Sequence, residues 1–267
     1  MPLISTHIHG QFCWAELVAH NMPAAVEFYG RTLGWTLTDL NSSADDCIPH
    51  VQFLNEGQPV AGLIQLPDHL KTAGLPSVWN TYVCVDNLQN SLKQAVELGA
   101  EITCPVTNAG EHGLVAFIRD PTGGVIGLWQ KGSHGGPCLR GDINAVCWNE
   151  LATRDAYAAK TFYAKLFGWT FEDNPMSPSP YFIVMSSDGE QIGGIMQMTE
   201  EWGDMPSHWN IYFHVDAVDA VTVTVQQLRG KMLVPPFDTP VGRIAVLADD
   251  QGAAFSVIRL EAAAQVA

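Results

Sequence analysis

The chain contains the same sequence pattern twice. The segment Cys13-Trp14-Ala15-Glu16-Leu17 returns 134 positions later as Cys147-Trp148-Asn149-Glu150-Leu151. Further matches follow in the same order: Phe28-Tyr29 with Phe162-Tyr163, Gly34-Trp35-Thr36 with Gly168-Trp169-Thr170, Trp79-Asn80-Thr81-Tyr82 with Trp209-Asn210-Ile211-Tyr212, and Asp120 and Gly123 with Asp249 and Gly252. Ordered matches over this length indicate a tandem duplication of a unit of about 130 residues, so the chain must build one fold twice.

The domain boundaries follow from the repeat. Residues 131–141 include Lys131-Gly132-Ser133-His134-Gly135-Gly136-Pro137, whose Gly and Pro content is typical of a linker. We therefore expect a first domain over 1–130 and a second over 142–267. Two domains also agree with a length of 267 residues.

Each half contains its own pattern of elements twice. Residues 11–18 are predicted as a strand, and a helix then runs from an N-cap at Asn21 to a stop at Gly34. The remaining prediction for the first half is strands at 35–39, 48–54, 60–66 and 78–85, a helix from Asp86 or Asn87 to Leu98, and strands near 101–104, 114–119 and 124–130.

The second half is expected to copy this order, with Asp155 as the cap and Gly168 as the stop of its first helix. The run 221–225 has β-branched residues, but the apolar spacing of Val218, Val221 and Val225 favours a helix there.

A sheet that carries a single helix leaves its other face uncovered, so two such units are expected to pair. The predicted fold class is therefore α+β: a tandem duplication of paired βαβββ modules. Each half would form a curved mixed sheet around a cavity, with the helices outside.

Composition excludes several classes of partner. Thirteen basic residues oppose 28 acidic ones, for a formal net charge of −15, and no run of Lys or Arg occurs. A nucleic-acid backbone or an anionic membrane surface would therefore meet few clustered basic side chains to bind. No apolar stretch reaches the ~20 residues of a membrane span. The first residues do not form a signal peptide pattern, so we expect a cytoplasmic protein.

The six cysteines, Cys13, Cys47, Cys84, Cys104, Cys138 and Cys147, form no C-x-x-C motif and are expected to be reduced.

The motifs resemble those of the vicinal oxygen chelate superfamily, which includes glyoxalase I, bleomycin-resistance proteins and extradiol dioxygenases. The resemblance rests on Phe28-Tyr29-Gly30-Arg31-Thr32-Leu33-Gly34-Trp35, on its repeat Phe162-Tyr163-Ala164-Lys165-Leu166-Phe167-Gly168-Trp169, and on Asp120-Pro121-Thr122-Gly123. It covers nearly the whole chain in two copies. More narrowly, Cys147-Trp148-Asn149-Glu150-Leu151 resembles a two-domain bacterial glyoxalase-like branch.

The resemblance implies four strand positions that hold a divalent metal in the family, typically as His or Gln, Glu, His and Glu. In this chain those positions hold Trp14, Gln65, Asn80 and Gly127 in the first half, and Trp148, Gln197, Asn210 and Ser256 in the second. None is a histidine or a carboxylate, which are the ligands that divalent ions prefer. We therefore expect no metal of the family type, and no nucleotide cofactor because no phosphate-binding glycine motif is present.

Strand periodicity gathers a different set of residues in each half. Residues two apart share a face, so Trp14 lies with Glu16 and Asn80 with Tyr82; in the second half, Trp148 lies with Glu150 and Asn210 with Tyr212. Gln65 and Gln197 complete the predicted ligand-binding sets. The glutamates are the candidate catalytic residues, as general bases or as anchors for a ligand hydroxyl or amine. The alternative is that each accepts hydrogen bonds from backbone or tyrosine and holds the sheets together.

A metal site outside this pattern stays open, because histidines could supply it. The candidates are His7 with His9, and His50, His69, His112 and His208 in loops and at strand ends, with His214 within a strand.

Two functions remain. One is a binding protein for a small, largely apolar organic molecule, of the type seen in bleomycin resistance. The other is an enzyme of the superfamily (a lyase, isomerase, hydroxylase or dioxygenase-like member) that uses Glu16 and Glu150 or an off-pattern metal. A monomer and a homodimer are both compatible with the sequence.

Overall fold

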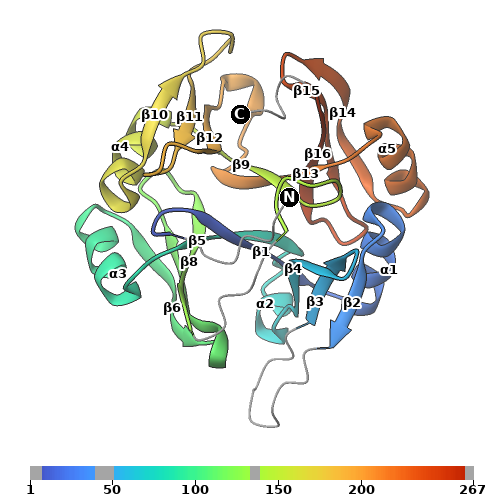
Figure 1. Ribbon diagram of the computed structural model, residues 1–267, viewed down its shortest axis with the longest axis horizontal. Helices are drawn as coiled ribbons and strands as arrows, with labels where there is room; N and C mark the ends of the chain where they lie inside the picture. The colour runs from blue at the N-terminus through green and yellow to red at the C-terminus, as the bar shows by residue number, and fades with distance from the viewer. Residues whose placement is uncertain (1–7, 40–50, 133–138, 262–267) are drawn as a thin grey trace.

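The computed structural model describes residues 8–39, 51–132 and 139–261. It contains two eight-stranded mixed sheets, one in each half of the chain (Figure 1). Tandem modules with helices outside mixed sheets confirm the predicted α+β class.

The first half consists of two βαβββ modules. The first module comprises β1 (Phe12–Ala19), α1 (Met22–Leu33), β2 (Thr36–Asp39), β3 (Val51–Asn55) and β4 (Gln58–Gln65). After the short helix α2 (Asp68–Thr72), the second comprises β5 (Val78–Cys84), α3 (Leu88–Glu97), β6 (Glu101–Asn108), the 3-10 turn η1 (Gly110–His112), β7 (Gly113–Arg119) and β8 (Val125–Lys131).

The second half repeats this order. Its first module comprises β9 (Val146–Thr153), α4 (Ala156–Phe167), β10 (Thr170–Asp173), β11 (Tyr181–Met185) and β12 (Gln191–Gln197). After η2 (Glu200–Trp202), its second comprises β13 (His208–His214), α5 (Val218–Gln227), β14 (Lys231–Thr239), β15 (Gly242–Ala248) and β16 (Ala254–Leu260).

The predicted helix ends are confirmed where the structure describes them. Asn21, Asn87 and Asp155 each accept a hydrogen bond from a backbone N–H in the first helical turn. Gly34 and Gly168 end α1 and α4 with φ of 70° and 72°, a left-handed conformation that favours glycine. The 221–225 run lies inside α5, so the helical spacing of its apolar side chains outweighs its β-branched composition. Positions 48–50 of one predicted strand lie outside the described residues.

The first strands of the two modules meet at the centre of each sheet. The order is β2-β3-β4-β1-β5-β8-β7-β6 in the first half and β10-β11-β12-β9-β13-β16-β15-β14 in the second. β1 runs parallel to β4 and antiparallel to β5, which places Glu16 beside Gly62 on one side and Asn80 on the other. Glu150 has the same neighbours, Gly194 and Asn210. Both glutamates therefore lie at the centre of a sheet.

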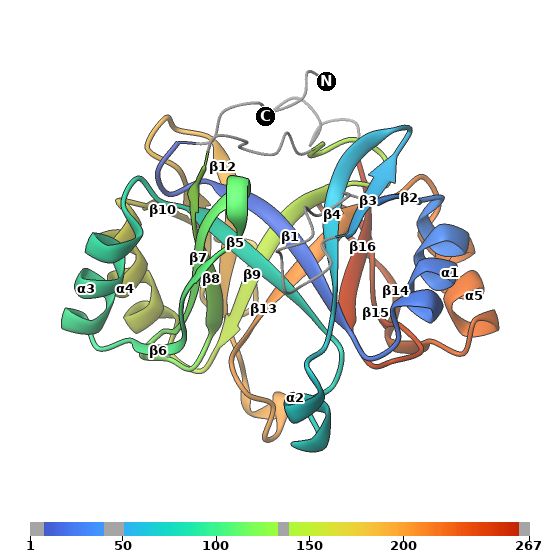
Figure 2. The same ribbon diagram turned by 90° about the horizontal axis from the view of Figure 1, so that it is seen from below.

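The two halves share their hydrophobic cores. α1 lies beside α5 at one end of the molecule and α3 beside α4 at the other, with the strands between them (Figures 1 and 2). One core contains Leu17 and Tyr29 of the first half with Phe213 and Phe255 of the second. The other mixes the halves in the same way. Burial of apolar area in these cores stabilises the two domains together.

Two buried hydrogen-bond sets also join the halves. Tyr163 of α4 donates to Asp120 at 2.6 Å and accepts from the Trp209 indole at 3.1 Å. In the related set, Tyr29 donates to Asp249 at 3.1 Å and accepts from Trp79 at 2.8 Å. The aspartates and tyrosines of the repeated motifs are thus engaged at the interface between the halves.

Among the residues that the structure describes, no helix is both long and apolar enough to cross a membrane.

Candidate functional site around Glu16 and Glu150

Each glutamate lies on the sheet face opposite the helices. Ala15 and Leu17 point into a core with α1, so the alternation of the strand sends Trp14 and Glu16 to the other face. Tyr82 of the neighbouring strand packs there with Cys13, Cys84 and Trp129. In the second half, Trp148 packs with Tyr212 and Ile258. The predicted pairing of an indole, a carboxylate and a phenol is therefore present in both halves.

In the first half, Glu16 has one phenol as a partner. Its side chain is 9% exposed, and its Oε1 accepts a 2.8 Å hydrogen bond from the Tyr82 hydroxyl. Within the described part of the chain, Oε2 accepts no hydrogen bond, yet it is not fully enclosed. Among the described residues, Glu16 thus has a partner at Oε1 and none at Oε2.

In the second half, both oxygens of Glu150 are occupied. Tyr212 donates to Oε1 at 2.7 Å, and Tyr181 of β11 donates to Oε2 at 2.8 Å. The indole Nε1 of Trp148 donates to the Tyr181 hydroxyl at 3.2 Å. Tyr181 is not among the site residues predicted from the sequence. In the repeat, the sequence position that matches Tyr181 holds His50, so comparison of the two halves gave no signal for a tyrosine there. His50 lies outside the described residues.

The asparagines on the fifth strand of each half also differ in their hydrogen bonds. Asn210 donates to Ser256 at 2.7 Å. In the first half the position of Ser256 is held by Gly127, and Asn80 makes no side-chain hydrogen bond to a described residue. The polar groups of the second half thus bind one another, whereas Asn80 and Glu16 Oε2 have no hydrogen-bond partner among the described residues of the first half.

Burial raises the pKa of both carboxyls. Desolvation raises the pKa of Glu16 from 4.5 to about 7, and the Tyr82 hydrogen bond acts against it. Desolvation also raises the pKa of Glu150, but hydrogen bonds from Tyr212 and then Tyr181, with the charge of His208, lower it. Glu16 can exchange a proton near neutral pH, which a general acid or base requires.

Gln65 and Gln197 bind backbone at the ends of their strands. Gln65 Nε2 donates to the carbonyls of Ala19 and His20 at 3.0 and 2.7 Å. Gln197 Oε1 accepts from the first-turn N–H of Ala156 at 2.9 Å, and its Nε2 donates to the Arg154 carbonyl. The structure thus joins each glutamine to the turn before a helix, and does not hydrogen-bond it to the glutamate cluster.

The residues at the four family metal positions do not fit a divalent ion. Gln65 and Gln197 direct amide N–H groups to backbone carbonyls, Asn210 is bound to Ser256, and Trp14 and Gly127 offer no ligand atom. One carboxylate beside an indole and a phenol supplies too little anionic oxygen. The described residues contain no group of three or more His, Cys, Asp and Glu placed to hold a metal.

The remaining histidines and cysteines are dispersed. His9 Nδ1 accepts from the Asp86 N–H at 3.3 Å, and His208 contacts the Pro206 carbonyl at 2.9 Å. Of the described cysteines, Cys13 and Cys84 are buried and Cys104 and Cys147 are partly buried, and these four form no disulfide with one another. His7, His50, Cys47 and Cys138 lie outside the described residues.

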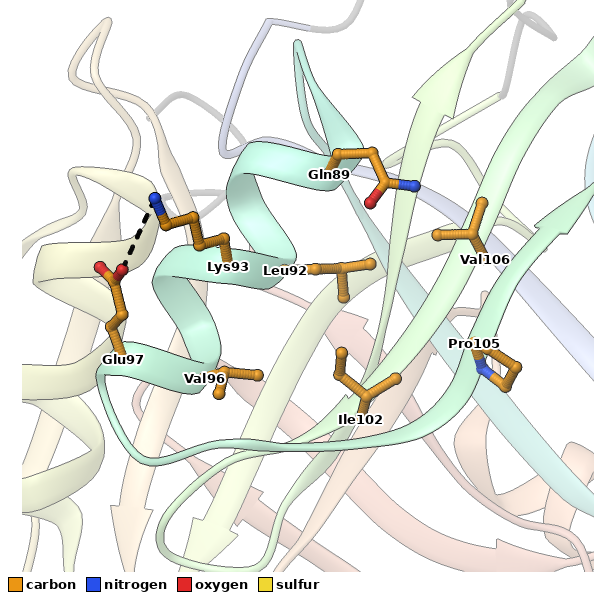
Figure 3. A pocket seen from close by; sticks show the side chains of 8 residues that line it. All are labelled: Gln89, Leu92, Lys93, Val96, Glu97, Ile102, Pro105 and Val106. Carbon is orange, nitrogen blue, oxygen red and sulfur yellow. Dashed lines mark ion pairs between the residues drawn. The ribbon is translucent and has the colours of Figure 1, made fainter.

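A separate groove of about 560 Å³ lies between α3 and β6 (Figure 3). It is lined by Gln89, Leu92, Lys93, Val96, Glu97, Ile102, Pro105 and Val106. Its charged groups are the exposed pair Lys93 and Glu97, 3.9 Å apart. None of the predicted site residues borders this groove.

Comparisons with known proteins place the chain in a family. The Glyoxalase/Bleomycin resistance protein/Dioxygenase superfamily matches residues 11–128 and 143–257. A Mycobacterium tuberculosis protein with the provisional name glyoxylase CFP32 is 33% identical over 97% of this chain and 98% of its own length. The anthracycline biosynthesis protein DnrV of Streptomyces peucetius is 28% identical over 94% of both chains.

A solved structure shares the fold. The 2,3-dioxygenase LapB from Pseudomonas sp. KL28 superposes with a TM-score of 0.62 over 95% of this chain and 93% of its own, at 14% identity. At that identity the likeness concerns the fold and leaves the chemistry to the site. The two family matches cover both halves of the duplication, and the chain belongs to the glyoxalase/bleomycin resistance protein/dioxygenase superfamily.

Proposed function

We propose that the protein binds a small, largely apolar organic molecule on the inner face of its sheets, without the divalent metal of its family. The observation that carries this proposal is Glu16 Oε2, which accepts no hydrogen bond from any residue that the structure describes. A buried carboxyl with an unused acceptor, beside an indole and a phenol, is the kind of polar anchor that fixes a mostly apolar ligand.

Two further observations support it. The four family metal positions supply amides, an indole and a glycine in the first half, where anionic ligands would be needed. The relative DnrV is named for the biosynthesis of anthracyclines, which are small organic compounds. We assign the ligand to the first half, because the corresponding groups of the second half bind one another.

An enzyme that uses Glu16 as an acid or base is the second candidate. It is favoured by the raised pKa of Glu16, about 7, which lets the carboxyl both take up and release a proton near neutral pH. The rate of such an enzyme would change with pH around 7 as Glu16 titrates, and Glu16→Gln would remove this pH dependence. A binding protein would show no turnover at any pH.

The deciding experiment begins with the metal content of the purified protein, measured by mass spectrometry before and after chelation. We expect less than about one-tenth of an equivalent of any transition metal, given the donor set. A compound library is then screened on the metal-free protein by thermal shift. Aromatic and apolar compounds are expected to raise the Tm. A stoichiometric metal whose removal abolishes all binding would contradict the proposal.

The cytoplasmic location inferred from the sequence stays a prediction, which fractionation of the producing cells would test.

A further inference from the structure

A β-bulge turns the side chain of Cys13 to the sheet face opposite the helices. Phe12 pairs with Val83 and Trp14 pairs with Tyr82, so Cys13 is the extra residue between these two pairs. Strict alternation would send the side chains of Cys13 and Trp14 to opposite faces, but both belong to one cluster. The Cys13 thiol donates to the Tyr82 carbonyl oxygen at 3.5 Å.

Cys84 reaches the same cluster from the neighbouring strand, although the cysteines are dispersed in the sequence. It lies two residues after Tyr82 on β5, so the two side chains share a face. Its N–H donates to the Gln11 carbonyl and its carbonyl accepts from the Gly10 N–H, both at 2.8 Å. Cys13 and Cys84 are 2% and 4% exposed. Two thiols, one from each strand, therefore meet in a buried cluster.

The two side chains also interact with each other. A hydrogen bond between Cys13 and Cys84 lowers the pKa of Cys84. Burial and the charge of Asp86 act against it, whereas the charge of Lys131 supports it. Because the thiolate is the nucleophilic form of cysteine, this contact favours Cys84 as the thiol that attacks an oxidant.

The second half holds one thiol at the equivalent place. Cys147 occupies the same bulge, and its thiol donates to the Tyr212 carbonyl oxygen at 3.4 Å. The position of Cys84 is held by His214, whose Nδ1 contacts the Gly141 carbonyl at 3.0 Å. Burial raises the pKa of Cys147 to about 12, so this thiol stays protonated at neutral pH. The duplication thus supplies a matched site with a single cysteine.

From this arrangement we infer that Cys13 and Cys84 form an oxidation site, at which a small hydroperoxide produces a disulfide between β1 and β5. The Cys84 sulfur attacks a peroxide oxygen, the O–O bond breaks, and water or an alcohol leaves with the thiol proton. The Cys13 sulfur then attacks the sulfenic acid of Cys84, so that the S–S bond forms, the S–O bond breaks and water leaves. The peroxide accepts the two electrons that the thiols lose.

Oxidation would change the strand that supplies the partner of Glu16. A disulfide has no S–H group, so the hydrogen bond from Cys13 to the Tyr82 carbonyl would be lost. The hydroxyl of the same Tyr82 donates to Glu16. The oxidation site thus lies beside the candidate functional site, but it does not depend on the binding of any ligand.

The test uses the full-length protein, which is fully reduced and then treated with hydrogen peroxide. Remaining thiols are blocked with iodoacetamide in denaturant, and the peptides are identified by mass spectrometry. We expect a pair of peptides joined through Cys13 and Cys84, lighter by two hydrogen atoms, which dithiothreitol separates. In Cys13→Ser, dimedone should trap a sulfenic acid on Cys84, because the second thiol is absent.

Variants of the second half provide the control. Cys147→Ser should leave the yield of the Cys13–Cys84 cross-link unchanged. His214→Cys restores the second thiol of the matched site and should give an additional cross-link to Cys147. Circular dichroism of each variant establishes that it is folded before the peroxide is added.

The outcomes decide the inference without deciding the proposed function, which is measured as ligand binding to the reduced protein. Recovery of Cys13 and Cys84 as separate alkylated peptides after peroxide treatment would overturn it. Cross-links that join either residue to a different cysteine would also overturn it. Should Cys13→Ser fail to fold, the cross-link in the unsubstituted protein still gives the answer.

Discussion

The hydroxyl of Tyr163 lies 2.6 Å from Asp120 Oδ2, and this hydrogen bond joins α4 of the second half to the turn before β8 in the first. Asp120 is only 3% exposed, and its Oδ1 accepts from Thr122 and Gly124. The bond therefore holds a buried carboxyl whose other oxygen is already occupied. In the related pair, Tyr29 of the first half donates to Asp249 of the second half.

Tyr163→Phe is expected to destabilise the whole protein. It removes one donor from buried Asp120 and the acceptor of the Trp209 indole, and an unsatisfied buried group costs about 1–3 kcal/mol. The free energy of unfolding from urea titration measures the loss. Tyr157→Phe, on the same helix but 61% exposed, serves as the control and should change stability by less than about 0.5 kcal/mol. Equal effects of the two variants would contradict a role for the Asp120 bond.

Glu16→Gln is expected to change how stability depends on pH. The pKa of Glu16 is about 7 in the folded protein against an ordinary 4.5, so the folded state binds more protons between these values. The stability contributed by protonated Glu16 is fully present below pH 4.5 and is lost as the pH rises through 7. At 1.36 kcal/mol per pKa unit the loss is about 3 kcal/mol.

The variant lacks this loss, because the amide does not ionise and can still accept from Tyr82. Its stability relative to the unsubstituted protein should therefore increase as the pH rises from 5 to 8. Urea titrations at several pH values check the difference. Parallel stability curves for the two proteins would show that Glu16 titrates at its ordinary pKa.

Tyr181→Phe is expected to raise the pKa of Glu150. The Tyr181 hydroxyl stabilises the ionised carboxyl, and its removal leaves the Tyr212 hydroxyl as the phenolic donor to Glu150. Carbon-detected NMR of the Glu150 carboxyl gives the pKa directly. The pKa of Glu16, in the other half, should stay unchanged in the same sample. A fall in the pKa of Glu150 would contradict the hydrogen-bonded geometry.

Gly194→Ala is expected to destabilise the second half by about 1–3 kcal/mol, because the added methyl group would overlap the Tyr181 phenol. Tyr181→Ala in the same chain should relieve this overlap. The double variant should then be more stable than the sum of the two single effects predicts. Thermal and urea unfolding of the four proteins measure this coupling. Additive effects would mean that Gly194 and Tyr181 do not contact each other.

Local sequence determined much of the fold. The duplication, the four modules and the caps at Asn21 and Asp155 could be predicted, because helix ends and strand alternation depend on residues a few positions apart. The same alternation placed Trp14, Glu16 and Tyr82 on one face. The family resemblance also indicated that the usual metal ligands are replaced.

The tertiary structure decided which partners the predicted groups have. Glu16 and Glu150 occupy equivalent positions in sequence, but Tyr181 reaches Glu150 from β11 and has no counterpart among the repeated motifs. Likewise, Gln65 and Gln197 are bound by turn carbonyls, and Tyr163 reaches Asp120 across the halves. A buried hydrogen bond depends on which side chains meet across strand registers and domain interfaces. That meeting is set by packing of distant segments, and no local pattern in the sequence records it.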